Sequence, residues 1–262
     1  MSKIAVCVIS RDMLHASFAF DLVNLMMYTA TSGHQVTLCQ NVGTGIAGQR
    51  ESVAGDALKK GAEYLLWLDS DHRIPIETAV NLLKHDVDIV GCNYATRSPE
   101  PGPTAKKVSA DRRVWSEVHT TRESKGLEVV NGLGFGCILI KAEVFRQIKL
   151  QKKNGHERPW FTFMYSNVNN EVLGEDLFFA WMAEECGFQL YLDHDHSKHV
   201  RHIGCFEYSL DHVETVIDHK KSLAAAEAIA RVAEEERKER AKQDAADEEA
   251  YAYAAQAEEA AA

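Results

Sequence analysis

The chain of 262 residues lacks any uninterrupted run of the about 20 apolar residues that a membrane-spanning helix needs. Its first ten residues form a short strand-like run without the cleavage pattern of a signal peptide. Six cysteines are scattered singly through apolar stretches without C-x-x-C spacing, which argues against a disulfide framework and a zinc site. We therefore expect a cytoplasmic protein whose cysteines are reduced and buried.

Proline is scarce, and three of the five prolines lie between residues 99 and 103. Regular periodicity is missing from Tyr94 to Lys125, so we expect a long loop there. Residues 97 to 125 carry seven basic and four acidic side chains. This local excess of positive charge can attract an anionic acceptor, nucleic acid included, although a solvated loop is the simpler interpretation.

Glycine and proline are absent from Leu223 to Ala262. This segment consists mainly of helix-favouring residues and carries eleven acidic and five basic side chains, a net charge of −6 out of −10 for the chain. Its apolar stripe is too narrow to pack well on a domain. We predict one domain over residues 1–222 and a charged helical or disordered tail over 223–262, with possible self-association through the tail.

The central feature of the sequence is the stretch from Glu63 to His72, in which bulky apolar residues lead directly into Asp69 and Asp71. The apolar run predicts a strand buried on both faces. If the chain stays extended, both carboxylates lie on one side, and a cation between them would relieve their repulsion. Mg²⁺ and Mn²⁺ take oxygen ligands and are often shared with phosphates, which suggests a metal-bound pyrophosphate at this edge of a sheet. The alternative is that Asp69 and Asp71 belong to an ordinary polar turn, in which one of them caps the helix that begins near Pro75.

Strand and helix patterns alternate along most of the chain, beginning with a β-α-β unit that favours parallel pairing. The sequence therefore predicts an α/β fold with a mostly parallel central sheet. The expected strands cover residues 3–9, 35–39, 63–69, 87–92 and 188–192, with one more after the alternate glycines of 132–136 and up to residue 140. The expected helices cover 15–31, 49–60, 75–85, 142–149 and 175–187.

Two glycine-rich stretches are candidates for contact with a ligand. Residues 41–48 do not have the spacing of a dinucleotide fingerprint, but they let a helix begin near a ligand, with Arg50 in its first turn. Arg50 either binds phosphate or is a solvated surface residue. The alternate glycines from Gly132 to Gly136 allow a sugar to approach the main chain, or form a bulge at a sheet edge.

Acidic, aromatic and histidine clusters occupy the later part of the chain. Glu175 and Asp176 begin a helix, where the helix dipole stabilises them as caps and keeps a general base ionised. The aromatic residues within 159–163 form either core or a stacking platform. Of the histidines between 194 and 202, we expect most at the surface, whereas His202 is the candidate metal ligand.

Taken together, these residues resemble GT-A glycosyltransferases, in particular small family 2-like members that include bacteriophage-encoded enzymes. Asp69-Ser70-Asp71 is similar to the DxD motif, Gly174-Glu175-Asp176 is similar to the later xED motif, and His202 lies where many members have a C-terminal metal ligand. The resemblance covers Lys3 to about Tyr208. It implies a Rossmann-like GT-A fold, the nucleotide-diphospho-sugar transferase fold.

The resemblance also implies roles for individual residues. Asp71 and His202 would ligate Mn²⁺ or Mg²⁺, and Asp69 would bind the metal or the ribose of the donor. Asp176 would remove the proton from the acceptor hydroxyl, with inversion at the sugar. The contacts to the donor, most simply a UDP-sugar, would come from Arg11, Arg50, Asp69, Gly134 and Glu175.

The acceptor is open, and two other functions compete with this one. The resemblance to phage enzymes makes a hydroxymethylated pyrimidine in phage DNA conceivable, with the enzyme in the host cytoplasm, although an acidic body argues against tight DNA binding. A sugar nucleotidyltransferase would normally have a glycine-rich basic signature after the first strand, which residues 10–13 do not supply. A nucleotide-sugar-binding or assembly protein without turnover is the non-enzymatic alternative.

Overall fold

The computed structural model describes residues 1–97, 101–110, 114–153, 155–165 and 172–204, together with Arg231 and Glu234. Met1–Gly204 is one compact unit and Cys205–Ala262 is a second. The predicted domain boundary after residue 222 and, apart from two helical residues, the predicted tail lie outside the described residues. None of the helices in the described part combines the length and apolarity that a membrane crossing requires.

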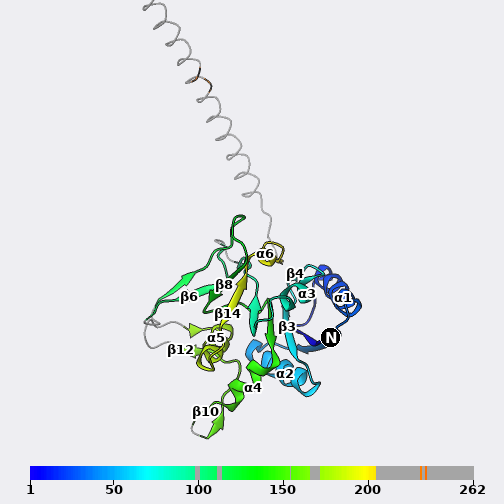
Figure 1. Cartoon of the computed structure of the whole chain (residues 1–262), viewed down its shortest axis with the longest axis vertical. Coiled ribbons are helices and arrows are strands. Elements are labelled where there is room, and N and C mark those ends of the chain that lie inside the picture. The colour runs from blue at the N-terminus through cyan, green and yellow to red at the C-terminus, as the bar shows by residue number, and fades with distance from the viewer. Residues whose placement is uncertain are drawn as a thin grey trace, which may run out of the picture. The chain divides into compact units, whose positions relative to one another are not determined.

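Within the described residues, seven strands form a central sheet in the order β2-β1-β3-β9-β5-β14-β8 (Figure 1). Five of these strands run in one direction, whereas β8 and β9 are antiparallel to their neighbours. The predicted α/β class with a mostly parallel sheet is therefore confirmed. The strands are β1 (Lys3–Ser10), β2 (Gln35–Val42), β3 (Tyr64–Asp69), β5 (Ile89–Gly91), β8 (Leu127–Val130), β9 (Cys137–Lys141) and β14 (Leu190–Asp193).

Helices cover both faces of the sheet because successive strand residues point to opposite sides. Ile4, Val6 and Val8 of β1 pack on the face that carries α1 and α3, and the alternate residues of β1 pack on the opposite face with α2, α4 and α5 (Figure 1). The helices are α1 (Ala16–Thr31), α2 (Ile46–Lys59), α3 (Thr78–Leu83), α4 (Ala142–Leu150), α5 (Glu175–Glu185) and the short α6 (His194–Ser197).

The core of the second face is aromatic. Trp67 on β3 is fully buried and contacts the rings of Phe135, Phe145 and Phe161 at centroid distances of 5.5, 6.4 and 5.6 Å. Trp160 is also buried and donates a hydrogen bond to the carbonyl of Phe145. Of the two interpretations of the aromatic stretch, the core interpretation holds for Trp160 and Phe161.

In the described part of the chain, four small two-stranded sheets lie outside the central one. They pair β4 (His72–Arg73) with β15 (Arg201–His202), β6 (Lys106–Val108) with β7 (Trp115–Glu117), β10 (Lys152–Lys153) with β11 (His156–Glu157), and β12 (Met164–Tyr165) with β13 (Val172–Leu173). The β6–β7 pair lies inside the segment predicted to be a loop, because strands of three residues are too short to show periodicity. The β4–β15 pair positions the site.

Candidate metal centre

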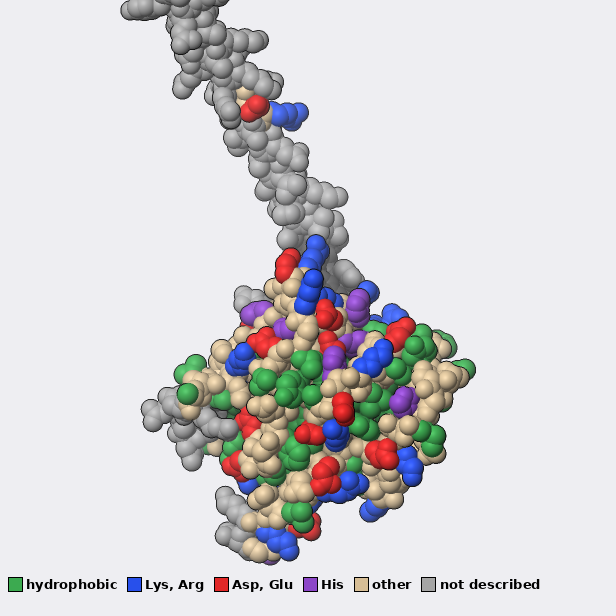
Figure 2. Space-filling view, viewed as in Figure 1, with side chains coloured by type: hydrophobic (Ala, Val, Ile, Leu, Met, Phe, Trp, Pro, Cys, Tyr) green, Lys and Arg blue, Asp and Glu red, His purple; other side chains and the backbone are tan. Residues whose placement is uncertain are grey.

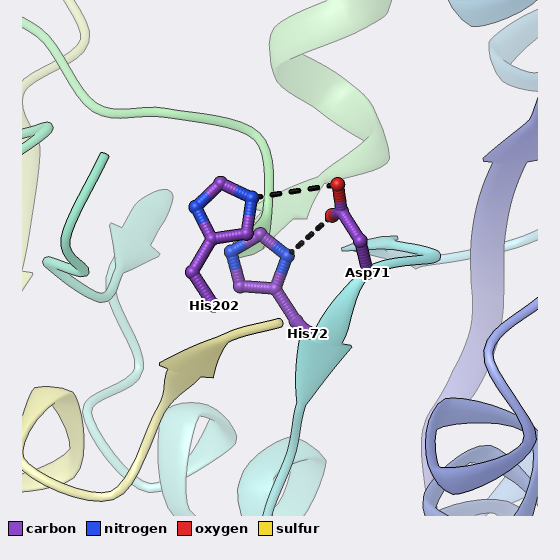
Figure 3. Close-up of side chains that lie close together, drawn as sticks. All are labelled: Asp71, His72 and His202. Carbon is purple, nitrogen blue, oxygen red and sulfur yellow. Dashed lines mark hydrogen bonds and ion pairs between the residues drawn. The ribbon is translucent and has the colours of Figure 1, made fainter. Parts of the chain in front are cut away.

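Three side chains from two distant parts of the sequence, Asp71 with His72 and His202, meet beyond the end of β3. The chain leaves β3 at Asp69, turns through Ser70 and Asp71, and enters β4 at His72. His72 lies directly opposite His202 in the antiparallel β4–β15 pair. Opposite residues in such a pair are close neighbours, and the two imidazoles stack with centroids 4.4 Å apart and planes 16° apart. Figure 3 shows both rings facing the carboxylate of Asp71.

The distances fit a single divalent cation. His72 Nδ1 lies 3.1 Å from Asp71 Oδ1, and His202 Nε2 lies 3.4 Å from Asp71 Oδ2. One ligand atom from each residue lies within 4.8 Å of the other two. Metal–nitrogen bonds of about 2 Å allow three such atoms to share one ion. Two imidazoles and one carboxylate suit a transition-metal ion better than Mg²⁺, which prefers oxygen alone.

His72 is held rigidly in this cluster. Its side chain is fully buried, its ring contacts Tyr94 edge-on at 4.4 Å, and its Nε2 has no hydrogen-bond partner within the described part of the chain. His72 was not among the metal ligands predicted from the sequence. Its position directly after Asp71 was visible in the sequence, but its register opposite His202 was not.

Opposing effects act on the pKa of the Asp71 carboxyl. Burial by itself would raise the pKa of Asp71, but the hydrogen bond to His72 and the charges of His72, Arg97 and His202 outweigh burial and lower it to about 2. Arg97 Nη2 lies 2.8 Å from Asp71 Oδ2. Asp71 therefore stays ionised over the whole physiological range, as a metal ligand must.

Asp69 belongs to a different charge cluster from Asp71. Its Oδ1 accepts a hydrogen bond from Arg50 Nη2 at 3.3 Å, and Arg50 Nη1 also binds the carboxylate of Glu175. The expected alternation of Asp69 and Asp71 along a strand does not apply, because the extended strand ends at Asp69 and a turn follows. The group of candidate metal ligands, Asp71, His72 and His202, is called the metal-ligand cluster below, and it contains His72 in the place where the sequence predicted Asp69.

Arg50 is buried, with only 3% of its side chain exposed, and its guanidinium lies 4.9 Å from the centroid of the Phe135 ring. It neutralises two carboxylates from inside the protein. The solvated-surface interpretation of Arg50 is thus wrong, and its role as a nucleotide contact stays a prediction.

The two acids at the start of α5 lie next to this buried arginine. Burial raises the pKa of Glu175 and of Asp176, and the positive charge of Arg50 only partly offsets this effect. The backbone N–H of Leu177 also donates to Asp176 Oδ1 at 2.8 Å. Burial is therefore the largest influence on the pKa of both acids, and the expected effect of the helix dipole stays a prediction. An ionised carboxylate with a raised pKa is the stronger base.

A cavity of about 470 Å³ opens next to the metal-ligand cluster, at the carboxyl ends of β1 and β3. Asp69, Asp71 and His202 line it, together with Arg11, which was predicted to contact a donor, and residues of the glycine-rich loop before α2. In parallel α/β sheets, ligands bind at this edge. The cavity thus brings together four of the predicted site residues: Arg11, Asp69, Asp71 and His202.

Gly134 and Gly136 lie against the side chains that support the cluster. A Cβ atom at Gly134 would come 2.2 Å from the hydroxyl of Tyr94, and one at Gly136 would come 2.7 Å from the His72 ring. The N–H of Gly136 donates to the Tyr94 hydroxyl at 2.9 Å. These glycines are therefore needed for tight packing around Tyr94 and His72, and the predicted contact of Gly134 with a sugar stays a prediction.

Two of the other histidines differ from expectation, whereas His199 is exposed as expected. His194 and His196 are buried, where the sequence suggested surface positions. His194 hydrogen-bonds with Glu128 and Thr120, and His196 with Thr78. Burial lowers the pKa of His196. Their side chains are satisfied by protein partners, so they have structural roles.

Comparison with known proteins identifies no family. No family model matches the chain, and no curated protein matches it. Among solved structures, A197 from STIV aligns with a TM-score of 0.44 and 15% identity over 79% of this chain and 97% of its own. A glycosyltransferase involved in the glycosylation of the major capsid of PBCV-1 aligns with a TM-score of 0.28 and 13% identity over 74% of this chain and 98% of its own. Alignments at these scores carry no argument about function.

Proposed function

We propose that this protein is a metal-dependent glycosyltransferase that transfers a sugar from a nucleotide-sugar donor to an acceptor hydroxyl, with a GT-A type of fold. One observation carries the proposal: the cluster of Asp71, His72 and His202 borders a cavity at the carboxyl edge of a mostly parallel sheet. A divalent ion beside a cavity of this size suits a ligand that carries phosphate groups.

The chain's own residues have separable roles in this proposal. Asp71, His72 Nδ1 and His202 Nε2 would hold the cation, with Mn²⁺ favoured over Mg²⁺ by the two imidazoles. The cation would supply the charge that neutralises a departing nucleoside diphosphate. Arg11 on the cavity wall and Asp69 at the end of β3 would contact the donor's phosphates and ribose.

Asp176 is the proposed general base. Its carboxylate is fixed by the N–H of Leu177 and sits in the electrostatic neighbourhood of Asp69 and Arg50. A raised pKa makes the ionised carboxylate a better proton acceptor for a sugar-accepting hydroxyl. Direct attack by that hydroxyl on the anomeric carbon would break the bond to the diphosphate and invert the sugar's configuration.

One candidate for the acceptor is a hydroxymethylated pyrimidine in DNA. Among the described residues of the stretch from 97 to 125, basic side chains form the ion pairs Arg97–Asp71, Lys106–Glu117 and Lys107–Glu128. Acidic and basic side chains alternate over the face shown in Figure 2. Phosphate neutralisation drives affinity for DNA, so we expect weak binding to the duplex backbone. Gel shifts at low salt with modified and unmodified DNA, combined with labelled donor, test this acceptor.

The decisive experiment is a panel of nucleotide sugars incubated with the protein, with Mn²⁺ and with chelator. We expect release of nucleoside diphosphate from at least one donor, dependent on Mn²⁺ and lost in Asp71→Asn. Binding of a nucleoside diphosphate without any release of sugar would support the non-enzymatic alternative. Formation of a nucleotide sugar from a nucleoside triphosphate and a sugar phosphate would support a nucleotidyltransferase.

A further inference from the structure

We propose that Arg97 is a counter-cation that occupies Asp71 in the metal-free protein, is displaced when a divalent cation binds, and then contacts phosphate groups of the ligand. The inference rests on the proposed metal and diphosphate site. It adds that metal binding and phosphate binding at this site both depend on the side chain of Arg97.

Arg97 and a bound cation would compete for one oxygen atom, Oδ2 of Asp71. Arg97 Nη2 lies 2.8 Å from Asp71 Oδ2, and His202 Nε2 lies 3.4 Å from the same oxygen. The other oxygen, Oδ1, faces His72. An ion held by His202 and Asp71 must therefore lie close to the position of the guanidinium, and two cations at such a separation repel each other strongly.

The exposure of Arg97 allows its side chain to move away from Asp71. Its side chain is 49% exposed, whereas the Arg50 side chain is 3% exposed and is held by both Asp69 and Glu175. An ion pair with an exposed partner contributes little to stability, so water can replace Arg97 at Asp71 at low cost. The site thus combines a fixed, buried guanidinium beside Asp69, that of Arg50, with an exchangeable guanidinium at Asp71, that of Arg97.

After it leaves Asp71, the Arg97 side chain can contact a ligand in the adjoining cavity. Arg97 and Arg11 both line the cavity beside the metal-ligand cluster. A guanidinium released from Asp71 remains at the cavity wall, where its planar N–H groups match the oxygens of a phosphate. Metal binding would therefore prepare the phosphate site, and by linkage a bound phosphate would favour the metal.

The test uses Arg97→Gln with Arg146→Gln as a matched control. Arg146 on α4 is similarly exposed, at 51%, and pairs with one carboxylate, Glu143, at 3.4 Å. Mn²⁺ is titrated into each protein without nucleotide, and free Mn²⁺ is followed by electron paramagnetic resonance. We expect Arg97→Gln to bind Mn²⁺ about fivefold or more tightly than the wild type, within the usual range of coupling between sites. Arg146→Gln should bind it as the wild type does.

The second titration uses inorganic pyrophosphate at saturating Mn²⁺, followed by calorimetry. Here Arg97→Gln should bind about fivefold or more weakly, and Arg97→Lys should retain part of the affinity because it keeps the charge. The two effects have opposite signs, which a general loss of folding cannot produce. Unchanged or weaker Mn²⁺ binding by Arg97→Gln overturns the proposal, as does unchanged pyrophosphate binding.

Neither titration involves a sugar, so the outcomes separate the two proposals. If Arg97→Gln changes both the Mn²⁺ affinity and the pyrophosphate affinity as expected, but the wild type turns over no nucleotide sugar, the role of Arg97 is supported and the glycosyltransferase activity is refuted. Turnover without the shifts would refute the role of Arg97 alone. Failure of both the wild type and Arg97→Gln to bind Mn²⁺ would refute both.

Discussion

The imidazole of His202 stacks on that of His72, and both rings present a nitrogen to Asp71 (Figure 3). The stacking follows from the antiparallel register of β4 and β15, which places the two residues opposite each other. Because His72 is fully buried and packed on Tyr94, the two histidines form a prearranged set of candidate metal ligands. Prearranged ligands lower the entropic cost of binding an ion.

His72 is predicted to contribute more to metal binding than Asp69. His72→Asn should lower Mn²⁺ affinity at least about tenfold, the lower end of the loss that even outer-shell partners of a metal cause. Asp69→Asn should lower it less, because Asp69 lies outside the ligand cluster and pairs with Arg50.

Titration of Mn²⁺ into both variants measures the difference, and His119→Ala provides a control with an exposed histidine. Thermal melting in the absence of metal shows whether His72→Asn remains folded. A larger loss in Asp69→Asn than in folded His72→Asn would restore the two-aspartate site suggested by the sequence.

Asp176→Asn is predicted to abolish sugar transfer without weakening metal binding. Loss of a general base typically lowers the rate by about 10²- to 10⁴-fold, and Asp176 is outside the metal-ligand cluster. The measurement pairs turnover of the active donor with Mn²⁺ titration. Glu185→Gln, at the far end of the same helix, serves as control. Transfer at the wild-type rate by Asp176→Asn would remove Asp176 from the mechanism.

The same substitution is predicted to stabilise the protein. Burial raises the pKa of Asp176 above its ordinary value of 3.8, so the ionised carboxylate is disfavoured in the folded state. Asparagine removes this cost at neutral pH. The gain should shrink as the pH falls through the raised pKa and vanish below 3.8, where the carboxyl is protonated in both the folded and unfolded states. Urea unfolding of both proteins at several pH values measures this dependence, and a gain that grows towards low pH would contradict it.

Arg50→Met is predicted to be strongly destabilising. It would leave Glu175 and Asp69 without their buried counter-charge, and removal of one partner from such a pair costs about 3–5 kcal/mol. The free energy of unfolding in urea is the measurement, with Arg146→Met as the surface control. The double variant Arg50→Met with Glu175→Gln should recover part of the loss. A cost under about 1 kcal/mol, the usual range for a surface pair, would show that the ion pair is exchangeable.

Gly136→Ala is predicted to disturb the metal-ligand cluster through His72. The added Cβ would lie 2.7 Å from the His72 ring and from Tyr94, so these rings must move. We expect a loss of about 1–3 kcal/mol, as for other overpacked cores, together with weaker Mn²⁺ binding. Gly55→Ala in α2 is the matched control. A Cβ there meets nothing within 4 Å, and alanine should stabilise the helix by about 0.5–1 kcal/mol. Wild-type Mn²⁺ affinity in Gly136→Ala would show that His72 does not act through this packing.

Local patterns in the sequence determined the elements of the fold. The apolar stretch from Tyr64 to Leu68 predicted a buried strand, and the alternation of strands with helices predicted a mostly parallel sheet. The ends of α1 and α5 agree with the helices predicted over 15–31 and 175–187, and Gly33 and Gly187, which follow these helices, adopt the positive φ angles typical of such ends. These features depend on neighbouring residues, which the sequence displays directly.

Contacts between distant residues were decided by the tertiary structure alone. The sequence made Asp71 and His202 candidates, but only the register of β4 with β15 added His72 to them. Only the structure excluded the surface interpretation of Arg50, which is buried in an ion pair with Asp69 and Glu175, and only burial in the folded domain raises the pKa of Asp176. Strand register and burial arise from packing over the whole domain, so no local pattern encodes them.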